Sequence, residues 1–214
     1  MTTKQTAMIW GASGGIGFAL LKQLIDADWQ VAAISRDPEK TRDLTPHSFA
    51  ADVHNELSVQ RAVMETHASI GEIALWIYAV GDITAVPVQK MNARQWHTIL
   101  EANLNGAFLT THHSLPLLRD NAHLIYLGAV SERLRLPGLA AYAAAKAGLE
   151  AFAEALRKEE RQKRIIVVRP GAVDTPFWEK VPLRLPKDAA SPDKVAARIM
   201  GAYRENYAGF LDLV

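Results

Sequence analysis

Residues 7–17 read Ala7-Met8-Ile9-Trp10-Gly11-Ala12-Ser13-Gly14-Gly15-Ile16-Gly17. The apolar residues 7–10 predict a strand buried on both faces of a sheet, and residues 16–27 have the apolar periodicity of a helix. The glycines between them let the backbone turn sharply and approach a phosphate closely. The N-terminus of the following helix offers free N–H groups and a partial positive charge. The stretch therefore predicts a strand, a turn and a helix that suit a phosphate group, although a plain tight turn has the same pattern.

The same alternation of apolar runs and helical segments continues along the chain. Further strands are predicted at residues 31–34, 48–51, 74–78, 123–127, 164–168 and 210–214. Further helices are predicted at residues 55–68, 93–118, 140–162 and 191–204. Pro116 should end or kink the second of these helices, and Ser191 should cap the last one. Because apolar strands alternate with helices and no linker intervenes, we expect residues 1–214 to form one α/β domain, a doubly wound parallel sheet with helices on both faces.

Composition argues against several classes of protein. The chain has 24 Lys and Arg against 23 Asp and Glu and no basic run, so we expect no nucleic-acid partner. It has no cysteine, which excludes disulfides and thiolate chemistry. The adjacent His112 and His113 should not face one another on a helix, so we expect no metal site. No signal peptide and no apolar run near the ~20 residues of a membrane span is visible. We expect a cytoplasmic protein with a small-molecule substrate and no membrane partner.

Tyr142 and Lys146 lie four residues apart in a predicted helix, so their side chains share one face. An unperturbed tyrosine has a pKa near ~10, which is poorly matched to proton transfer at neutral pH. A nearby ammonium group favours the phenolate and should lower that pKa. The pair therefore predicts an acid/base group, although the same spacing also occurs by chance on solvated helices.

Two motifs together connect the chain to a known family. The glycine loop has the spacing Gly-x-x-x-Gly-x-Gly, with Gly11, Gly15 and Gly17, instead of G-x-G-x-x-G. Residues 137–147 contain Pro-Gly, an apolar residue and then Tyr-x-x-x-Lys-Ala. The chain resembles the short-chain dehydrogenase/reductase family over nearly its whole length. The resemblance implies a single Rossmann-type domain and an oxidoreductase that transfers hydride between a nicotinamide cofactor and a small substrate.

The resemblance also implies roles for individual residues. Tyr142 would donate or accept the proton, Lys146 would also hold the nicotinamide ribose, and Asn103 would support a water and Lys146. A buried, backbone-bonded asparagine is the structural alternative for Asn103, and the two roles are compatible with each other. The Val173 backbone and the Thr175 hydroxyl would bind the nicotinamide carboxamide. The full cofactor-binding set is Gly11, Ser13, Gly14, Gly15, Ile16, Gly17, Ser35, Arg36, Asp52, Val53, Ala79, Gly81, Tyr142, Lys146, Pro170, Gly171, Val173 and Thr175.

The residues after the second predicted strand bear on the choice of cofactor. An NAD-preferring site usually has an acid there to hold the ribose 2′-OH, whereas this chain has Ser35 followed by Arg36. A guanidinium can pair bidentately with a 2′-phosphate, which favours NADP(H). Asp37 is adjacent, so NAD(H) remains possible, and Arg36 could instead be a solvated loop residue. After the third strand, the family places a pair such as Asp52-Val53 beside the adenine, although an aspartate there is more often a turn former.

The sequence departs from the family at two places. The catalytic serine would stand thirteen residues before Tyr142, where this chain has Ala129, and Ser131 is a candidate replacement two residues out of register. The strand-four motif Asn-Asn-Ala-Gly has become residues 78–81, Tyr-Ala-Val-Gly. Loss of one preorganised donor can cost about 10²–10³ in rate. The substrate is therefore one that does not need the donor, or the enzyme is slow on simple ketones.

Within the family, dihydropteridine reductases also lack the serine, and residues 79–81, 127–129, 173–176 and 209–211 resemble that branch. The expected substrate is a small carbonyl, an alcohol or a pterin-like imine, although Arg36 departs from a branch that commonly uses NADH. The alternative function is a redox sensor or interaction protein that binds NADP(H) without catalysis. The resemblance further implies a homodimer or homotetramer formed through the alanine-rich helix at 140–162.

Overall fold

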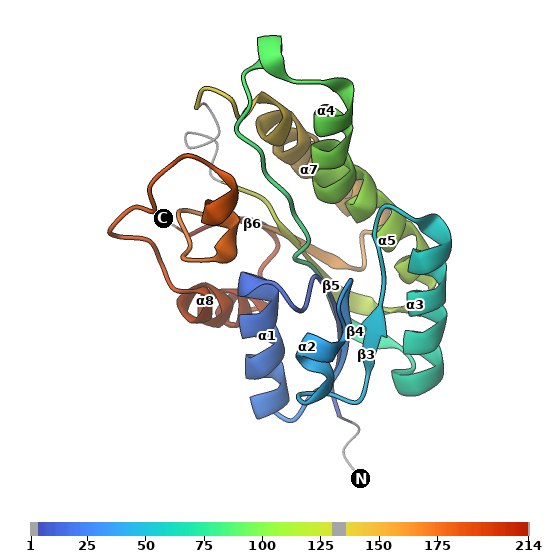
Figure 1. Ribbon diagram of the computed structural model, residues 1–214. Coiled ribbons are helices and arrows are strands. Elements are labelled where there is room, and N and C mark those ends of the chain that lie inside the picture. Colours follow the sequence, from blue (N-terminus) through green and yellow to red (C-terminus); the bar gives the residue numbers. More distant parts are fainter. Residues whose placement is uncertain (1–3, 130–135, 214) are drawn as a thin grey trace.

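The computed structural model describes residues 4–129 and 136–213, and seven parallel strands form one sheet across it (Figure 1). In spatial order the strands are β3 (Ser48–Ala50), β2 (Gln30–Ser35), β1 (Thr6–Trp10), β4 (Ile73–Tyr78), β5 (Leu118–Leu127), β6 (Arg164–Pro170) and β7 (Gly209–Leu213). Every neighbouring pair is parallel. The chain builds outward from β1 to β3 and then returns to the other side of β1 with β4. This reversal leaves a crevice at the carboxyl ends of β1 and β4, which is where such sheets bind ligands.

Helices cover both faces of the sheet, as the sequence predicts (Figure 1). One face carries α1 (Gly15–Asp26) and α8 (Pro192–Arg204), and the other carries α3 (Glu56–Ile70), α5 (Gly106–Ser114) and α7 (Ala140–Glu159). The shorter elements are α2 (Glu39–Arg42), η1 (Val88–Lys90), α4 (Ala93–Leu100), η3 (Leu115–Leu117) and η4 (Pro176–Lys180). In the described ranges, no helix combines the length and the apolar character that a membrane span requires.

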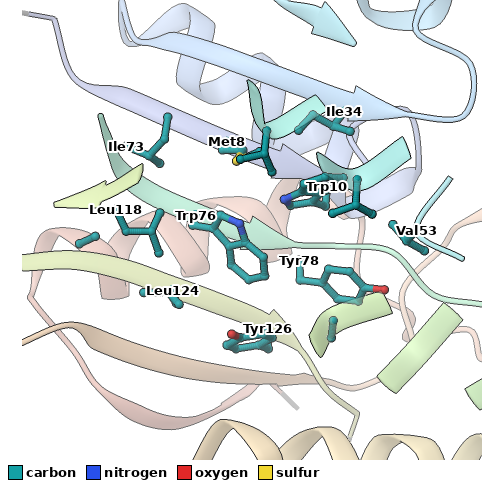
Figure 2. Close-up of a cluster of buried hydrophobic side chains, with 14 of the residues drawn as sticks. Met8, Trp10, Ile34, Val53, Ile73, Trp76, Tyr78, Leu118, Leu124 and Tyr126 are labelled. Carbon is teal, nitrogen blue, oxygen red and sulfur yellow. The ribbon is translucent and has the colours of Figure 1, made fainter. Parts of the chain in front are cut away.

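An aromatic cluster forms the centre of the core between the sheet and the layer of α3, α5 and α7 (Figure 2). The Trp76 ring lies 5.2 Å from the Tyr126 ring and stacks on the Tyr78 ring at 6.2 Å, and all three residues are fully buried. Large aromatic side chains contribute much of the apolar area that a core removes from water. The cluster therefore fixes the carboxyl end of β4, from which the loop toward the functional site departs.

The predicted helix at 93–118 is wrong in its extent. The segment divides into α4, a π-helical turn η2 (Glu101–Asn105), α5 and η3, and Leu118 already belongs to β5. Pro116 lacks the N–H that an α-helix needs, and α5 ends two residues before it. The start of β5 is hidden in the sequence because Asp120 and Asn121 are exposed and polar. The other long elements lie where the sequence predicts them, with ends that differ by a few residues, and the Ser191 side chain accepts the expected capping hydrogen bond from Lys194 N.

Candidate active site

The glycine loop packs directly against the end of β4. Gly11 has a φ of +84°, a region that favours glycine, and a Cβ on it would lie 2.8 Å from the Ala79 carbonyl carbon. A Cβ on Gly17 would lie 2.2 Å from the Gly11 carbonyl oxygen. The Ala79 N–H donates to the Trp10 carbonyl oxygen at 2.8 Å, which holds the two strand ends together. The spacing of the glycines is therefore required by the close approach of β1, α1 and the loop after β4.

The N-terminus of α1 is left open to an anion. Gly14 is its N-cap, makes no side-chain capping bond, and is followed by a first turn without an acidic residue. The first N–H groups of a helix have no partner within the helix, and the helix dipole favours negative charge there. This helix end, with the Gly14 backbone beside it, has the arrangement that binds phosphate groups elsewhere.

A cavity of about 160 Å³ lies at the carboxyl ends of β1, β2 and β4. Nine residues of the predicted cofactor set line it: Gly11, Ser13, Gly14, Ser35, Arg36, Asp52, Val53, Ala79 and Gly81. Sequence reasoning missed the other lining residues, which are Trp10, Ile34, Ala51, His54, Val80, Asp82 and Ala102. Most of these residues adjoin a predicted residue in the chain, at the carboxyl end of the same strand or in the loop after it. Their position next to the predicted strand ends was therefore the signal that could have identified them.

Two charged residues follow β2 at this cavity, and they differ in whether another side chain already pairs with them. Arg36 is exposed and forms no ion pair with any residue in the described part of the chain. Asp37 lies 3.7 Å from Lys40 Nζ, and the Ser35 hydroxyl donates to the Asp37 carbonyl oxygen at 2.9 Å. The guanidinium is therefore the group that can pair with a charged ligand at this end, whereas the Asp37 carboxylate is already beside a cation.

Asp52 forms the turn that the sequence allowed as its alternative role. Its carboxylate accepts from the His54 N–H at 3.0 Å, and its own N–H donates to the Ser58 hydroxyl at 3.1 Å. Val53 is buried next to it. Both residues still line the cavity, so the turn also presents them to a ligand.

Tyr142 and Lys146 share one face of α7, as their spacing predicts. Lys146 is only 3% exposed, and its Nζ donates to the Leu127 carbonyl oxygen at the end of β5, at 2.7 Å. The same Nζ lies 5.5 Å from the centre of the Tyr142 ring. The Tyr142 ring also lies 5.9 Å, between ring centres, from the ring of Phe177 in η4.

The expected effect of Lys146 on Tyr142 is wrong for the chain alone. Burial raises the pKa of Tyr142 well above its usual value, and burial lowers the pKa of Lys146 to about 8 against a smaller opposing effect of Glu150. The ammonium lies over the ring and donates to Leu127, so desolvation outweighs its attraction for a phenolate. Tyr142 therefore keeps its proton at neutral pH.

Asn103 lies in the π-helical turn and is fully buried. Its Nδ2 donates to the carbonyl oxygens of Asp82 at 2.7 Å and Ile99 at 2.8 Å, which fixes the orientation of the amide because only the nitrogen can donate. Its Oδ1 has no partner among the described residues. Asn103 is therefore the buried, backbone-bonded asparagine that the sequence allowed, and its Oδ1 remains as an unsatisfied acceptor.

Three predicted residues converge at one point of the site. A methyl group placed on Gly81 would lie 3.1 Å from Asn103 Oδ1 and 3.9 Å from Lys146 Nζ. Glycine at 81 therefore keeps open a space that an unpaired acceptor and an ammonium both border. Buried acceptors are normally satisfied by protein or water, so this space suits a donor.

The segment after β6 returns to the glycine loop. Strand β6 ends at Pro170, and the Gly171 N–H donates to the Leu213 carbonyl oxygen of β7 at 2.8 Å. A Cβ on Gly15 would lie 2.4 Å from Thr175 Cγ2, which places Thr175 against the N-terminus of α1.

The predicted residues that do not line the 160 Å³ cavity are Gly15, Ile16, Gly17, Tyr142, Lys146, Pro170, Gly171, Val173 and Thr175.

A family model described as short chain dehydrogenase matches residues 5–185. The chain belongs to the short chain dehydrogenase family. It is 28% identical to the sulfoacetaldehyde reductase 2 of Chromohalobacter salexigens over 79% of this chain and 73% of that protein. It is 25% identical to the acetoacetyl-CoA reductase of an Acinetobacter species over 97% of this chain and 94% of that protein.

Solved structures of similar proteins have the same fold. An alcohol dehydrogenase from Thermococcus sibiricus, complexed with 5-hydroxy-NADP, gives a TM-score of 0.89 at 21% identity, over 98% of this chain and 96% of that one. A 3-ketoacyl-(acyl-carrier-protein) reductase from Brucella melitensis, complexed with NADH, gives 0.87 at 20% identity, over 97% and 96%. The chain is thus an oxidoreductase of a family that uses NAD(P)(H).

Tyr78, at the first position of the altered short chain dehydrogenase motif in strand four, has a structural role that sequence reasoning missed. Its hydroxyl donates to the Ala102 carbonyl oxygen at 2.7 Å, in the turn that also carries Asn103. A Cβ on Gly106 would lie 2.6 Å from this hydroxyl, so glycine there makes room for it. The combination of a tyrosine at 78 and a glycine at 106 was the available signal, but only the tertiary contact reveals their connection.

The segment η4 covers Tyr142 and is attached at both ends. Phe177 contacts the Tyr142 ring, and Trp178 Nε1 donates to the Val173 carbonyl oxygen at 2.8 Å. Lys180 Nζ lies 2.6 Å from Asp82 Oδ1, which joins η4 to the loop after β4. A short chain dehydrogenase substrate would therefore lie beneath η4 when it contacts Tyr142.

Ala129 is the second residue after β5 and supplies no hydroxyl at the place of the family serine. The candidate replacement, Ser131, lies outside the described residues. In the described part of the chain, no group of three His, Asp or Glu residues is arranged to hold a metal ion. The expectation that His112 and His113 do not face one another is wrong, because their rings meet edge to face with 4.8 Å between ring centres. His113 Nε2 also lies 3.0 Å from Glu56 Oε1.

Proposed function

We propose that this protein is an NADP(H)-dependent reductase in which Tyr142 donates a proton to a small carbonyl or imine substrate. The observation that carries the proposal is the convergence of Lys146 and Asn103 at Gly81, with the Tyr142 ring 5.5 Å from Lys146 Nζ. Gly81 and Gly14, the N-cap of α1, line the same cavity. A cofactor, an acid and a substrate could therefore meet at one end of the sheet.

The residues present fit a dinucleotide phosphate. The open N-terminus of α1 suits a pyrophosphate, and the backbone at Gly11 and Gly14 can come close to it because no side chain intervenes. Arg36 would pair with a 2′-phosphate, and Asp52 with Val53 would border the adenine. Val173 and Thr175 would hold the carboxamide. The bound nicotinamide supplies or accepts hydride.

The protonation state of Tyr142 favours the direction of reduction. An ordinary tyrosine is already protonated at neutral pH, and burial raises the pKa of Tyr142 further, so the phenol can give its proton to the substrate oxygen or nitrogen as hydride reaches the carbon. Lys146 would hold the ribose hydroxyls and, as a cation over the ring, stabilise the phenolate left behind. Asn103 Oδ1 would accept from a water or from Lys146, which would connect Tyr142 to a source of protons.

Ala129 narrows the substrate class. Without the serine, Tyr142 is the side chain proposed to polarise the substrate, so we propose an acceptor that is already activated. A pterin-like imine fits this requirement, as does an activated carbonyl such as the sulfoacetaldehyde or acetoacetyl-CoA in the names of two relatives.

The test is NADPH oxidation by the purified protein with quinonoid dihydropterin, small aldehydes, simple ketones and a β-keto thioester. We expect turnover with an activated acceptor, and a loss of about 10² or more in Tyr142→Phe with unchanged NADPH binding measured by calorimetry. Tight NADPH binding without turnover on any acceptor, in both proteins, would instead support a redox sensor, the second candidate function, which the Ala129 substitution favours.

Cofactor preference is tested separately through Arg36. Arg36→Gln should weaken NADPH binding about tenfold or more and leave NADH binding nearly unchanged, because a charge-assisted hydrogen bond contributes about 1.5–3 kcal/mol. Arg61→Gln, an exposed arginine on α3, is the control. Equal weakening of both cofactors by Arg36→Gln would argue against a role in 2′-phosphate recognition.

A further inference from the structure

A second cavity, of about 300 Å³, lies at the opposite edge of the sheet from the proposed cofactor site. Its lining comes from the amino ends of β4, β5 and β6, from Gln5 just before β1, and from the end of α8. The lining includes Arg119, Asn121, His123, Arg164 and Tyr203. None of these residues has a role in the proposed reaction.

The cavity carries two positive charges with little compensation. Arg164 forms no ion pair with any residue of the described ranges, and no acidic residue lines the cavity. Arg119 Nε lies 4.0 Å from Glu72 Oε2, but that carboxylate side chain is 74% exposed, so the pair is weak. Each guanidinium group affects the pKa of a different residue that lines the cavity. Arg164 helps to lower the pKa of His123, and Arg119 works against the rise that burial causes in the pKa of Tyr203.

His123 brings an unsatisfied buried group to the same cavity. It is 4% exposed, and its Nε2 has no hydrogen-bond partner among the described residues. Its ring lies 4.6 Å from the Tyr203 ring, which fixes the side chain against α8. Burial, and then Arg164, lower the pKa of His123 to about 4, so the ring is neutral at pH 7. A neutral imidazole has one nitrogen that donates and one that accepts. A buried ring nitrogen without a hydrogen-bond partner destabilises the fold, unless a ligand in the cavity provides that partner.

We propose that this cavity is a second binding site, for inorganic phosphate or a small phosphate monoester. Arg119 and Arg164 would pair with the phosphate oxygens, and guanidinium forks match that geometry bidentately. The His123 ring and the Asn121 amide would add neutral hydrogen bonds. A phosphate has enough terminal oxygens to accept from all of these donors, and the cavity is at the small end of the usual range of ~300–1,000 Å³ for ligand pockets.

Histidine-ring NMR tests the proposal because each cavity contains its own reporter. His123 lines this cavity and His54 lines the proposed cofactor cavity, so phosphate bound at either place is recognised separately. Inorganic phosphate and glycerol phosphate would each be titrated at pH 7 and constant ionic strength, with chloride as the reference salt. We expect saturable shifts of the His123 ring signals, whatever the His54 signals show. A response to inorganic phosphate alone would identify free phosphate as the ligand, and a tighter response to glycerol phosphate a monoester.

Variants show whether the arginines bind the ligand. Arg164→Gln and Arg119→Gln should each weaken phosphate binding about tenfold or more, whereas Arg61→Gln should not change it. Unchanged His54 signals confirm that each variant is folded, and Arg164→Lys, which keeps the charge but loses the fork, should bind with intermediate affinity. The proposal is overturned if His123 does not respond, if chloride has the same effect as phosphate, or if neither Arg→Gln substitution weakens binding. Because no step depends on the cofactor, failure here would leave the proposed reductase function intact.

Discussion

Tyr78 connects the core to the site through one hydrogen bond. Its ring stacks in the aromatic cluster of Figure 2, and its hydroxyl holds the Ala102 carbonyl in the π-helical turn. Asn103 is the next residue of that turn, and its amide is in turn bonded to Asp82 and Ile99. Tyr78 therefore positions Asn103 and does not itself border the reacting atoms.

Tyr78→Phe should reduce both stability and turnover. It leaves the buried Ala102 carbonyl without its partner, which should lower the free energy of unfolding by about 1–3 kcal/mol. It should also lower kcat, because the turn that orients Asn103 is loosened. Urea denaturation and steady-state kinetics measure the two effects.

The matched control for this experiment is Tyr126→Phe. Tyr126 is buried in the same cluster, and its hydroxyl lies 2.8 Å from Thr111 Oγ1, away from the turn. This variant should lose comparable stability but keep its turnover. Equal losses of turnover in both variants would contradict the positioning role of Tyr78.

Lys146 should make stability depend on pH in a defined window. Its pKa is about 8 in the folded chain against an ordinary value of 10.5, so between these pH values the unfolded chain binds a proton that the folded chain does not. Stability contributed by this group therefore rises with pH across the window, by at most about 1.4 kcal/mol per unit, and below pH 8 the buried ammonium is destabilising.

Lys146→Met should consequently be more stable than the wild type near pH 7, with an advantage that shrinks from pH 8 toward 10. The lost hydrogen bond to Leu127 affects the variant similarly at each pH, so the trend isolates the titration of Lys146. Urea denaturation of both proteins at several pH values measures the difference. Unfolding free energies that stay parallel over this range would show that Lys146 titrates at an ordinary pKa.

At the scale of elements, η4 is held over Tyr142 by the ring contact of Phe177, by the hydrogen bond from Trp178 to Val173 and, at its end, by the ion pair of Lys180 with Asp82. The Lys180 and Asp82 side chains are 49% and 29% exposed, so their pair should contribute no more than about 1 kcal/mol and should be screened by salt. The Lys180–Asp82 pair is therefore the weakest charged attachment of η4 that a substrate entering beneath it would disturb.

Lys180→Met should raise the KM of the substrate about two- to fivefold, in keeping with an exposed ion pair. The difference from the wild type should diminish at high ionic strength. Lys163→Met, which removes the pair with Glu160 at the end of α7, is the control and should leave KM unchanged. A KM effect that does not respond to salt would argue that Lys180 acts by another contact.

At the scale of the whole molecule, one exposed apolar strip lies on the layer of α5 and α7. Ala144, Ala147 and Ala151 are exposed at helical spacing on α7, and Phe108 on α5 is 50% exposed and packs on Phe152. Small side chains allow another helix to approach closely. We expect this strip to be the contact between subunits of a homodimer or homotetramer.

Ala147→Arg should reduce the size of the assembly measured by light scattering after size-exclusion chromatography, because a long charged side chain would be buried between subunits. Met64→Arg on α3, where Met64 is 71% exposed, is the control and should leave the size unchanged. A monomeric wild type, or an assembly indifferent to Ala147→Arg, would rule out this contact.

The sequence by itself determined the alternation of strands and helices, the glycine loop and the pairing of Tyr142 with Lys146. These features depend on neighbours in the chain: an apolar run is buried wherever it folds, a glycine spacing is set by the turn, and residues four apart in a helix share a face. The parallel sheet with helices on both faces followed from the same local patterns and is confirmed.

Only the tertiary structure decided the features that depend on residues far apart in the chain. The raised pKa of Tyr142 results from burial, which the spacing to Lys146 could not reveal. The division of residues 93–118 and the contact of Tyr78 with Ala102 depend on how the chain packs against β4 and β5. The second cavity, which Arg119 and Arg164 line, is likewise formed by residues from β5, β6 and α8 that are far apart in the chain. Desolvation and close packing are set by all the surrounding elements together, and so they cannot be obtained from a local sequence pattern.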